Sequence, residues 1–335
     1  MARARPPAAS GTPERLPRAP EQPSQNAVSG RSTARQRVAL RWVVGALSVA
    51  TAFRLGLMLR GWPALDSDEA IIGLMARHIL SGGERPIFYY GQHYLGALDA
   101  YVAAGAFALL GPTALALHLS MLPFTIGFLL AAYALGRAAY GSAVGLLTLA
   151  FLAVGPAYGL LRETAAIGGY QETLLLGGAM LLLVYARLCR SAPLPQGRAE
   201  WVVTLGWYAL IGLLAGLGLW SDQLILPIVG AAVLALVCGR TREVRHLPAL
   251  ALVAGLIVGA WPLLIYNVQH GGVTFSELAS QNRVSGQIGP LPPLGAWLSQ
   301  IGALLAVGAP AVLGSPHVCI ASGGTWPSYP PALAA

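Results

Sequence analysis

Long apolar runs alternate along the chain with short connections that carry most of its polar residues. Most of these runs have close to the ~20 residues that a helix needs to cross the hydrocarbon core of a bilayer. They cover residues 38–59, 94–110, 114–135, 142–160, 173–188, 202–219, 223–238, 247–266 and 292–313. A helix satisfies its own backbone hydrogen bonds, as the bilayer interior requires. The pattern therefore predicts an all-α polytopic membrane protein, a bundle of transmembrane helices.

Composition supports this class. Hydrophobic residues make up 56% of the 335 positions and charged residues only 10%, whereas a soluble domain has about 25% charged residues. The chain has no lysine, so its 21 basic residues are all arginine, and its net charge is +8. In so apolar a chain, arginine indicates membrane topology rather than nucleic-acid binding. Cys189, Cys238 and Cys319 share no metal-ligand spacing and are interpreted as isolated thiols.

The first 36 residues are rich in Pro, Arg, Ser and Ala and have no apolar period. Such a segment buries too little surface to offset its ordering entropy, so residues 1–36 are predicted to be a disordered cytoplasmic tail. The apolar run that follows is too long for the core of a signal peptide, so we interpret it as a retained membrane anchor.

Arginine distribution orients the runs. The tail and the connections 187–200 and 239–246 are basic and are expected in the cytoplasm. All three can share one side only if one apolar run before residue 187 does not cross. The run 94–110 is the best candidate because Asp99 lies near its middle, where crossing would place a carboxylate in the bilayer. We expect this run to lie along the outer interface as an amphipathic helix.

With that assignment, residues 37–313 form the transmembrane domain, followed by an irregular tail. The domain has a first outer loop, 60–113, and a second outer loop, 267–290. Its polar residues collect on the outer face. Small residues within spans, as at 206–218, indicate close helix packing rather than a cofactor site.

Four carboxylates of the first outer loop, Asp66, Asp68, Glu69 and Asp99, fall within 34 positions, with Glu84 between them as a fifth. Asp66 and Glu69 have the spacing of a capping box, so they could simply begin a helix. Carboxylates beside a bilayer are costly unless they are paired or functional. The functional alternatives are a general base, an acceptor anchor or a metal site.

A helix is predicted from the second of these carboxylates, over residues 68–81. Its apolar positions share one face, which we expect to lie against the membrane. These positions are Ile71, Ile72, Met75 and Ile79.

Several motifs of this region and of later segments resemble one known group. They are D-E-A (68–70), A-R-x-I-L-x-G-G (76–83), Y-Y-G-Q-x-Y-L-G (89–96), L-G-R-A-A-Y-G (135–141), G-G-Y-Q-E-T (168–173), L-W-S-D-Q-L-I-L-P (219–227) and P-L-L-I-Y-N (262–267). In order and spacing the chain resembles, over residues 38–290, the polyprenyl-phosphate-dependent integral-membrane glycosyltransferases. This GT-C type group contains the protein O-mannosyltransferases and the bacterial lipid A aminoarabinose transferase.

The resemblance implies a site in the first outer loop. It makes Asp68 the general base, with Glu69 beside it as the second catalytic carboxylate, and it makes 68–81 and 94–110 two juxtamembrane helices. Some relatives place a lysine before the second of these helices to hold the donor phosphate, where this chain has Gln92 and His93. The phosphate would then be bound by an arginine or histidine among Arg77, Arg85, His93, Arg162 and Arg283.

The predicted substrate-binding set is Asp66, Arg85, Gln92, His93, Tyr170, Glu172 and Arg283. For Tyr170 and Glu172, in a Gly-flexible outer loop, a solvated turn and a substrate contact are equal alternatives. Asp222 is predicted to cap the span that begins near Gln223. No cofactor and no metal ligand is expected. A divalent ion is the less favoured alternative, since oxygen-only sites of two or three carboxylates usually need further ligands.

We therefore interpret the chain as an inverting glycosyltransferase of the plasma membrane and cell envelope. It would move a sugar from a polyprenyl-phosphate donor to a hydroxyl of a glycan, lipid or protein acceptor outside. The first alternative is a lipid-linked sugar transporter or flippase, but the carboxylates cluster on one side and no internal repeat is seen. The second is an inactive membrane scaffold, because the chain stops after an irregular segment, 314–335, where relatives continue. On that account we interpret it as C-terminally truncated.

Overall fold

The computed structural model of the chain describes residues 25–189 and 197–284. The chain divides into two compact units, residues 1–42 and 43–335. The described part of the first unit is the beginning of helix α1 (Gln25–Leu59). Helix therefore begins inside the predicted disordered tail. No proline lies between Pro23 and Pro63, and the Ala, Arg and Gln residues at the start of this stretch favour helix. The rest of that tail lies outside the described residues.

The described residues include four helices long and apolar enough to cross a membrane, or up to six if each bent pair is one span. The four are α1 over Val38–Leu59, α4 (Ala114–Tyr140), α7 (Tyr170–Cys189) and α8 (Arg198–Ser221). The bent pairs are α5 (Ser142–Val154) with α6 (Ala157–Thr164), at 81°, and α11 (Leu247–Gly259) with α12 (Trp261–Gln269), at 67°. This is the architecture expected of an all-α polytopic membrane protein.

A shorter apolar segment follows α8. It consists of the 3-10 turn η1 (Gln223–Ile225) and α9 (Leu226–Gly239), and the four-residue helix α10 (Thr241–Val244) then leads to α11. Each predicted run up to residue 266 thus corresponds mainly to helix, except that the run 94–110 begins in strand and the run 142–160 is broken between α5 and α6. The run predicted at 292–313 and the tail at 314–335 lie outside the described residues.

Helices α8 and α11 are packed with their backbones almost in contact. Gly212 and Gly216 on α8 meet Gly255 and Gly259 on α11. A Cβ atom on Gly212 would lie 1.9 Å from the carbonyl oxygen of Leu252. Small residues spaced by four let helix backbones approach closely, so the prediction that the Gly-rich spacing serves helix packing is confirmed here.

The first outer loop holds two helices and a hairpin: α2 (Ser67–Leu80), β1 (Phe88–Tyr89), β2 (Gln92–Gly96) and α3 (Leu98–Leu110). The hairpin was not predicted. It turns at Gly91, whose φ of 80° suits glycine, and the residues after it pair with β1. The second helix therefore begins at Leu98 rather than at residue 94. Its 13 residues extend about 20 Å, less than a bilayer core of about 30 Å.

The apolar face of α2 does not lie against the membrane as predicted. Ile72 and Met75 are fully buried in a cluster with alanines of α3, Phe107 and residues of α4, and Ile71 and Ile79 pack against the same cluster. The prediction was wrong because α3 folds back onto α2, so a stripe that would suit lipid meets protein instead.

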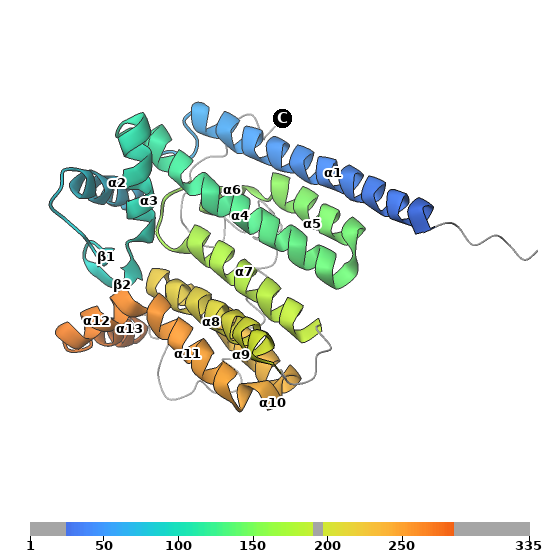
Figure 1. Ribbon diagram of the computed structural model, residues 1–335. Coiled ribbons are helices and arrows are strands. Elements are labelled where there is room, and N and C mark those ends of the chain that lie inside the picture. The colour runs from blue at the N-terminus through green and yellow to red at the C-terminus, as the bar shows by residue number, and fades with distance from the viewer. Residues whose placement is uncertain (1–24, 190–196, 285–335) are drawn as a thin grey trace, which may run out of the picture. The chain divides into compact units, whose positions relative to one another are not determined.

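Contacts between residues far apart in sequence show which ends of the helices lie together at each end of the bundle. At one end, the Trp220 indole N–H donates to the Ile87 carbonyl at 3.0 Å, which joins the end of α8 to the hairpin. At the other, Arg187 pairs with Glu243 at 2.6 Å and Arg240 donates to the Arg187 carbonyl at 2.9 Å. Figure 1 shows α2, α3, the hairpin, α12 and α13 (Val273–Val284) at one end of α4, α7, α8 and α11, and α10 at the other.

This sorting follows the topology deduced from arginine. The connections 187–200 and 239–246, predicted to share the cytoplasm, meet at one end through the Arg187, Arg240 and Glu243 contacts. The first outer loop meets α13, from the predicted second outer loop, at the opposite end, where the backbone N–H of His93 donates to Glu277 at 2.9 Å. Helix α3 and the start of α4 thus lie at one end of the bundle, and that α3 adds no crossing stays a prediction.

Cysteine labelling tests which end of α4 faces outward. Thr113 is exposed before its first turn and Arg137 is exposed in its last turn. In a background without the three native cysteines, we expect Thr113→Cys to react with a membrane-impermeant maleimide in intact cells. Arg137→Cys should react only after permeabilisation. The reverse pattern at both positions would mean that α3 crosses the membrane and that the arginine-based topology is wrong.

Candidate functional site

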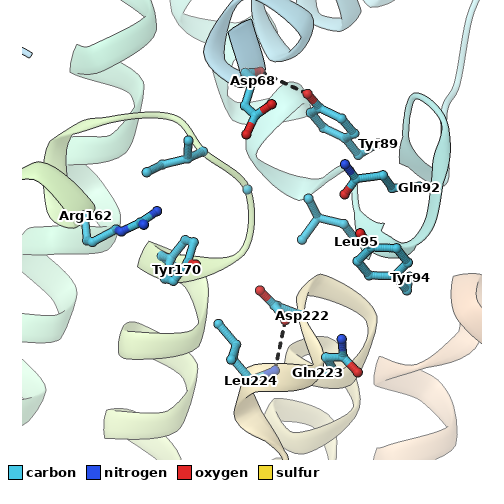
Figure 2. A pocket seen from close by; sticks show the side chains of 12 residues that line it. Asp68, Tyr89, Gln92, Tyr94, Leu95, Arg162, Tyr170, Asp222, Gln223 and Leu224 are labelled. Carbon is cyan, nitrogen blue, oxygen red and sulfur yellow. Dashed lines mark hydrogen bonds between the residues drawn. The ribbon is translucent and has the colours of Figure 1, made fainter. Parts of the chain in front are cut away.

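A cavity of about 410 Å³ opens where the hairpin, the segment after α6 and the junction of α8 with η1 meet (Figure 2). Its lining comes from α2, β1, β2, α6, α7 and η1 and from the connections beside them. The lining residues are Asp68, Tyr89, Gln92, Tyr94, Leu95, Arg162, Ile167, Gly168, Tyr170, Asp222, Gln223 and Leu224. The lining thus combines two carboxylates, one guanidinium, amides and phenols, which suits a polar ligand with an anionic group.

Asp68 reaches the cavity from the first turn of α2 and is exposed. In Figure 2 its carboxylate points toward the interior from one side and that of Asp222 from the opposite side. The Tyr89 hydroxyl donates to the backbone carbonyl of Asp68 at 3.4 Å. Burial, and then the negative charges of Asp68, Asp66 and Asp99, raise the pKa of Tyr89 to about 12. Tyr89 therefore stays a hydroxyl donor beside the Asp68 carboxylate.

The two carboxylates that flank Asp68 build the helix start. Asp66 accepts from the Glu69 backbone N–H at 2.9 Å, and Glu69 accepts from the Asp66 N–H at 3.3 Å, which is a complete capping box. Asp66 is exposed but does not line the cavity. The capping alternative is thus realised, and the substrate-binding prediction for Asp66 finds no support in the cavity.

Glu69 is buried, with 1% of its surface exposed, and does not line the cavity. Its Oε1 lies 2.8 Å from His118 Nε2 on α4 and accepts from the Ala166 backbone N–H at 2.8 Å. The catalytic prediction for Glu69 therefore has no support from the cavity, and its contacts are those of a structural residue. Neighbouring helix residues point about 100° apart. Asp68 therefore faces the cavity, while Glu69 binds α2 to the segment after α6, of which Ile167 and Gly168 line another wall.

Arg162 is the cation of the cavity lining. Its guanidinium carbon lies 4.4 Å from the Tyr170 ring centroid and 5.2 Å from that of Tyr158. Its Nε is buried without an acceptor, and within the described residues Arg162 takes part in no ion pair. A partly buried guanidinium held by aromatic faces and lacking a carboxylate is a binding point for an anionic ligand.

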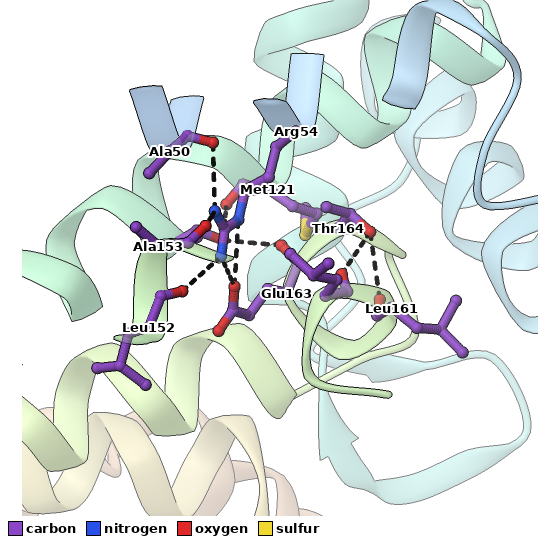
Figure 3. A network of polar contacts seen from close by, with 10 residues as sticks. Ala50, Arg54, Met121, Leu152, Ala153, Leu161, Glu163 and Thr164 are labelled. Carbon is purple, nitrogen blue, oxygen red and sulfur yellow. Dashed lines mark hydrogen bonds and ion pairs between the residues drawn. The ribbon is translucent and has the colours of Figure 1, made fainter. Parts of the chain in front are cut away.

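A buried arginine sets the position of α6, which carries Arg162 (Figure 3). Arg54 of α1 donates to the carbonyl of Ala153 at 2.8 Å and to that of Leu152 at 3.1 Å, and it pairs with Glu163. It thereby satisfies the free carbonyls at the end of α5. It also holds the carboxylate of Glu163, the residue that follows Arg162 in the sequence. The bend between α5 and α6 is fixed by these contacts.

The remaining predicted site residues separate into two groups. Gln92 and Tyr170 line the cavity, as a substrate-binding role requires. Arg85 is exposed and does not line it, and Glu172 is fully buried, so neither the solvated turn nor the substrate contact predicted for Glu172 occurs. Arg283 belongs to α13, but its side chain lies outside the described residues.

His93 contacts α13 instead of the cavity. Its Nδ1 lies 2.5 Å from Glu277 Oε1, its ring stacks on Tyr266, and its carbonyl accepts from the Thr274 hydroxyl at 2.5 Å. His93 therefore joins α13 to the hairpin, and the predicted substrate contact has no support from the cavity lining.

Asp222 was predicted only as a cap, and it does accept from the Leu224 backbone N–H at 2.9 Å. It also lines the cavity, which the sequence pattern did not indicate. Tyr94 and Gln223 were likewise not singled out. The signal for them was the pair of motifs Y-Y-G-Q-x-Y-L-G and L-W-S-D-Q, whose contact with each other only the fold creates.

Comparisons of the chain with protein-family models, with curated proteins and with solved structures found no match. Among the residues that the structure describes, no group of three or more His, Cys, Asp or Glu side chains is placed to hold a metal ion. The function is therefore argued from the cavity, its charges and the helices that surround it.

Proposed function

We propose that the chain is a membrane glycosyltransferase that moves a sugar from a polyprenyl-phosphate donor to an acceptor hydroxyl, with inversion. One observation carries the proposal: a single cavity at the end of an apolar helix bundle holds the exposed carboxylate of Asp68 and, on another wall, the unpaired guanidinium of Arg162. A lipid phosphate sugar has matching parts, namely an apolar tail, an anionic phosphate and a reacting carbon next to it.

Arg162 would bind the donor phosphate. A guanidinium forms short, charge-assisted hydrogen bonds to phosphate oxygens, and Tyr158 and Tyr170 hold this one in place. The phosphate would lie at the end of the bundle, with the polyprenyl chain along the apolar helices. Among the candidates whose side chains the structure describes, Arg162 is the one that lines the cavity.

Asp68 would act as the base. It would accept the proton of the acceptor hydroxyl while that oxygen forms its bond to the anomeric carbon and the bond to the phosphate oxygen breaks. The released polyprenyl phosphate keeps that oxygen and its electron pair, stabilised by Arg162. A single displacement with one base opposite the leaving group inverts the anomeric configuration, as in inverting glycosidases.

The arrangement of the first outer loop supports a GT-C-like bundle with α2 and α3 as its two juxtamembrane helices. Both follow α1 and pack together at the end that carries the cavity. By the arginine-based topology this end faces outward from the plasma membrane, with the N-terminus in the cytoplasm. The acceptor would be a glycan, a lipid or a protein.

A panel of radiolabelled polyprenyl-phosphate sugars, incubated with membranes that contain the protein, tests the activity. We expect transfer of label from one of these donors to an acceptor fraction. Movement of the intact lipid-linked sugar between leaflets, without transfer, would favour a transporter instead. Neither transfer nor movement with any donor would contradict both assignments.

Two arginine variants test the phosphate site. Arg162→Gln removes a charge-assisted hydrogen bond worth about 1.5–3 kcal/mol, so we expect donor affinity to fall roughly 10- to 100-fold. Arg85→Gln is the matched control, because Arg85 is exposed in the same outer region but does not line the cavity. Donor titrations of transfer rate measure both, and equal losses in the two variants would contradict the assignment of Arg162.

A further inference from the structure

Three carboxyl groups are buried together behind the cavity. Asp99 lies in the first turn of α3, Glu172 in the first turn of α7, and Asp222 between α8 and η1. Their exposed fractions are 1%, 0% and 7%. The mechanism proposed above uses neither Asp99 nor Glu172, and a buried ionisable group in a membrane protein is a functional candidate by default.

In the part of the chain that the structure describes, no cation forms an ion pair with this cluster. Both Glu172 oxygens and Asp99 Oδ2 are buried without any hydrogen-bond partner. The charges that act on Glu172 are those of Asp99 and Asp222, which have its own sign. Three ionised carboxylates in such a place would repel one another without compensation.

The two glycines after α6 connect the cluster to the cavity. The backbone N–H of Gly168 acts on Asp99 and lowers its pKa, and Gly168 also lines the cavity. Gly169 lies so close to Asp222 that a Cβ there would come within 2.6 Å of Asp222 Oδ2. Their φ angles of 71° and 75° suit glycine. Asp222 therefore lines the cavity, and its charge also acts on Glu172, which does not line it.

Burial raises the pKa of Asp99 to about 7, even though backbone N–H groups at Ala100 and Gly168 act in the opposite direction. Burial also raises the pKa of Asp222. The other titratable groups near the cluster line the cavity together with Asp222: the phenols Tyr89, Tyr94 and Tyr170, the carboxylate of Asp68 and the guanidinium of Arg162. On α4 the neighbouring His118 is already bonded to Glu69.

We propose that Asp99, Glu172 and Asp222 form a proton-binding site behind the cavity, which exchanges protons with a ligand group in the cavity through Asp222. The site holds at least one proton at neutral pH. A proton relieves the repulsion among the three carboxyl groups and can satisfy one orphaned oxygen by a hydrogen bond from another. The site is defined by burial and connectivity and does not depend on sugar transfer.

Infrared spectroscopy of the full chain in lipid nanodiscs tests this site. The probe is the C=O stretching band of a protonated carboxylic acid, which ionised carboxylates lack. We expect wild type to show this band at pH 7, to shift it in D2O and to lose it as the pH is raised. Glu172→Gln should lose all or part of the band, whereas Glu84→Gln should keep it, since Glu84 is exposed.

Absence of the band from wild type at pH 7 would overturn the proposal, whether or not the variants fold. Loss of the band on adding Na⁺ or Mg²⁺ at constant pH would also overturn it, because the cluster would then be a cation site. An unchanged band in both Glu172→Gln and Asp99→Asn would assign the proton elsewhere. Each of these outcomes can be interpreted even if the sugar-transfer assay detects no activity.

Thermal unfolding gives a second reading of the same site. The carboxyl of Asp99 has a higher pKa in the folded state, about 7, than in the unfolded chain, about 4. Its favourable contribution is therefore complete below about pH 4 and is lost as the pH rises through about 7. We expect the Tm of wild type to fall over this window and that of Asp99→Asn to fall less. A steeper fall in the variant would contradict the assignment.

Discussion

Asp68→Asn is expected to abolish sugar transfer while the protein still folds and binds its donor. Asparagine keeps the shape of the side chain but cannot accept the proton of the acceptor hydroxyl. Loss of a positioned general base typically lowers a rate by about 10²- to 10⁴-fold. Asp68 makes no side-chain contribution to the capping box, which belongs to Asp66 and Glu69, so the fold should tolerate the change. Single-turnover transfer from a bound, labelled donor measures the loss.

Asp66→Asn is the matched control for this variant. The same chemical change is made two residues earlier, at an exposed carboxylate outside the cavity lining. Asparagine is about as good an N-cap as aspartate, so α2 should keep its start. We expect near-normal transfer by Asp66→Asn. Near-normal transfer by Asp68→Asn would reject Asp68 as the base, and equal losses in both variants would indicate a structural effect.

The second large effect is expected in the fold, at the contact of α8 with α11. In Gly212→Ala the added Cβ would lie 1.9 Å from the Leu252 carbonyl oxygen, and in Gly255→Ala 2.0 Å from that of Ala209. Backbone atoms cannot move aside as a flexible side chain can, so the helices must separate. Overpacking of this kind costs about 1–3 kcal/mol, occasionally more. Thermal unfolding in detergent should show a clear fall in Tm for each variant.

Gly206→Ala provides the control within α8. Nothing lies within 4 Å of a Cβ at Gly206, so the substitution adds only the helix preference of alanine. That preference favours the folded state by about 0.5–1 kcal/mol. We expect an unchanged or slightly raised Tm. A fall equal to that of Gly212→Ala would mean that the α8–α11 contact is not what limits stability.

The site shows where local sequence suffices and where it does not. The capping box of Asp66 and Glu69 follows from a spacing of three residues, and it could be predicted because both partners lie in one helical turn. That Glu69 would be buried against His118 and Ala166 could not, because these partners are 49 and 97 residues away. A pair that looks equivalent in sequence thus divides into an exposed cavity carboxylate, Asp68, and a buried anchor.

Arg162 and Asp222 are residues whose place in the cavity could not be predicted from the local sequence. In sequence, Arg162 is one arginine among several and Asp222 is a cap. Both become cavity residues because the bend held by Arg54 and the hairpin bonded to Trp220 bring their segments together. The burial of Glu172 was missed for a related reason. The glycines before it suggested an exposed turn, whereas Gly169 lies against Asp222 and Gly168 lies near Asp99.

The sequence by itself determined the class of the protein and the places of its helices. Apolar runs near the thickness of a bilayer specify spanning helices through the hydrophobic effect, which acts on each run separately. Charge asymmetry also led to the prediction that 94–110 does not cross the membrane. Only the tertiary structure decided that α3 covers the apolar face of α2, and which polar side chains share a cavity. Those outcomes depend on pairwise contacts between distant segments, and no pattern within one segment encodes its partner.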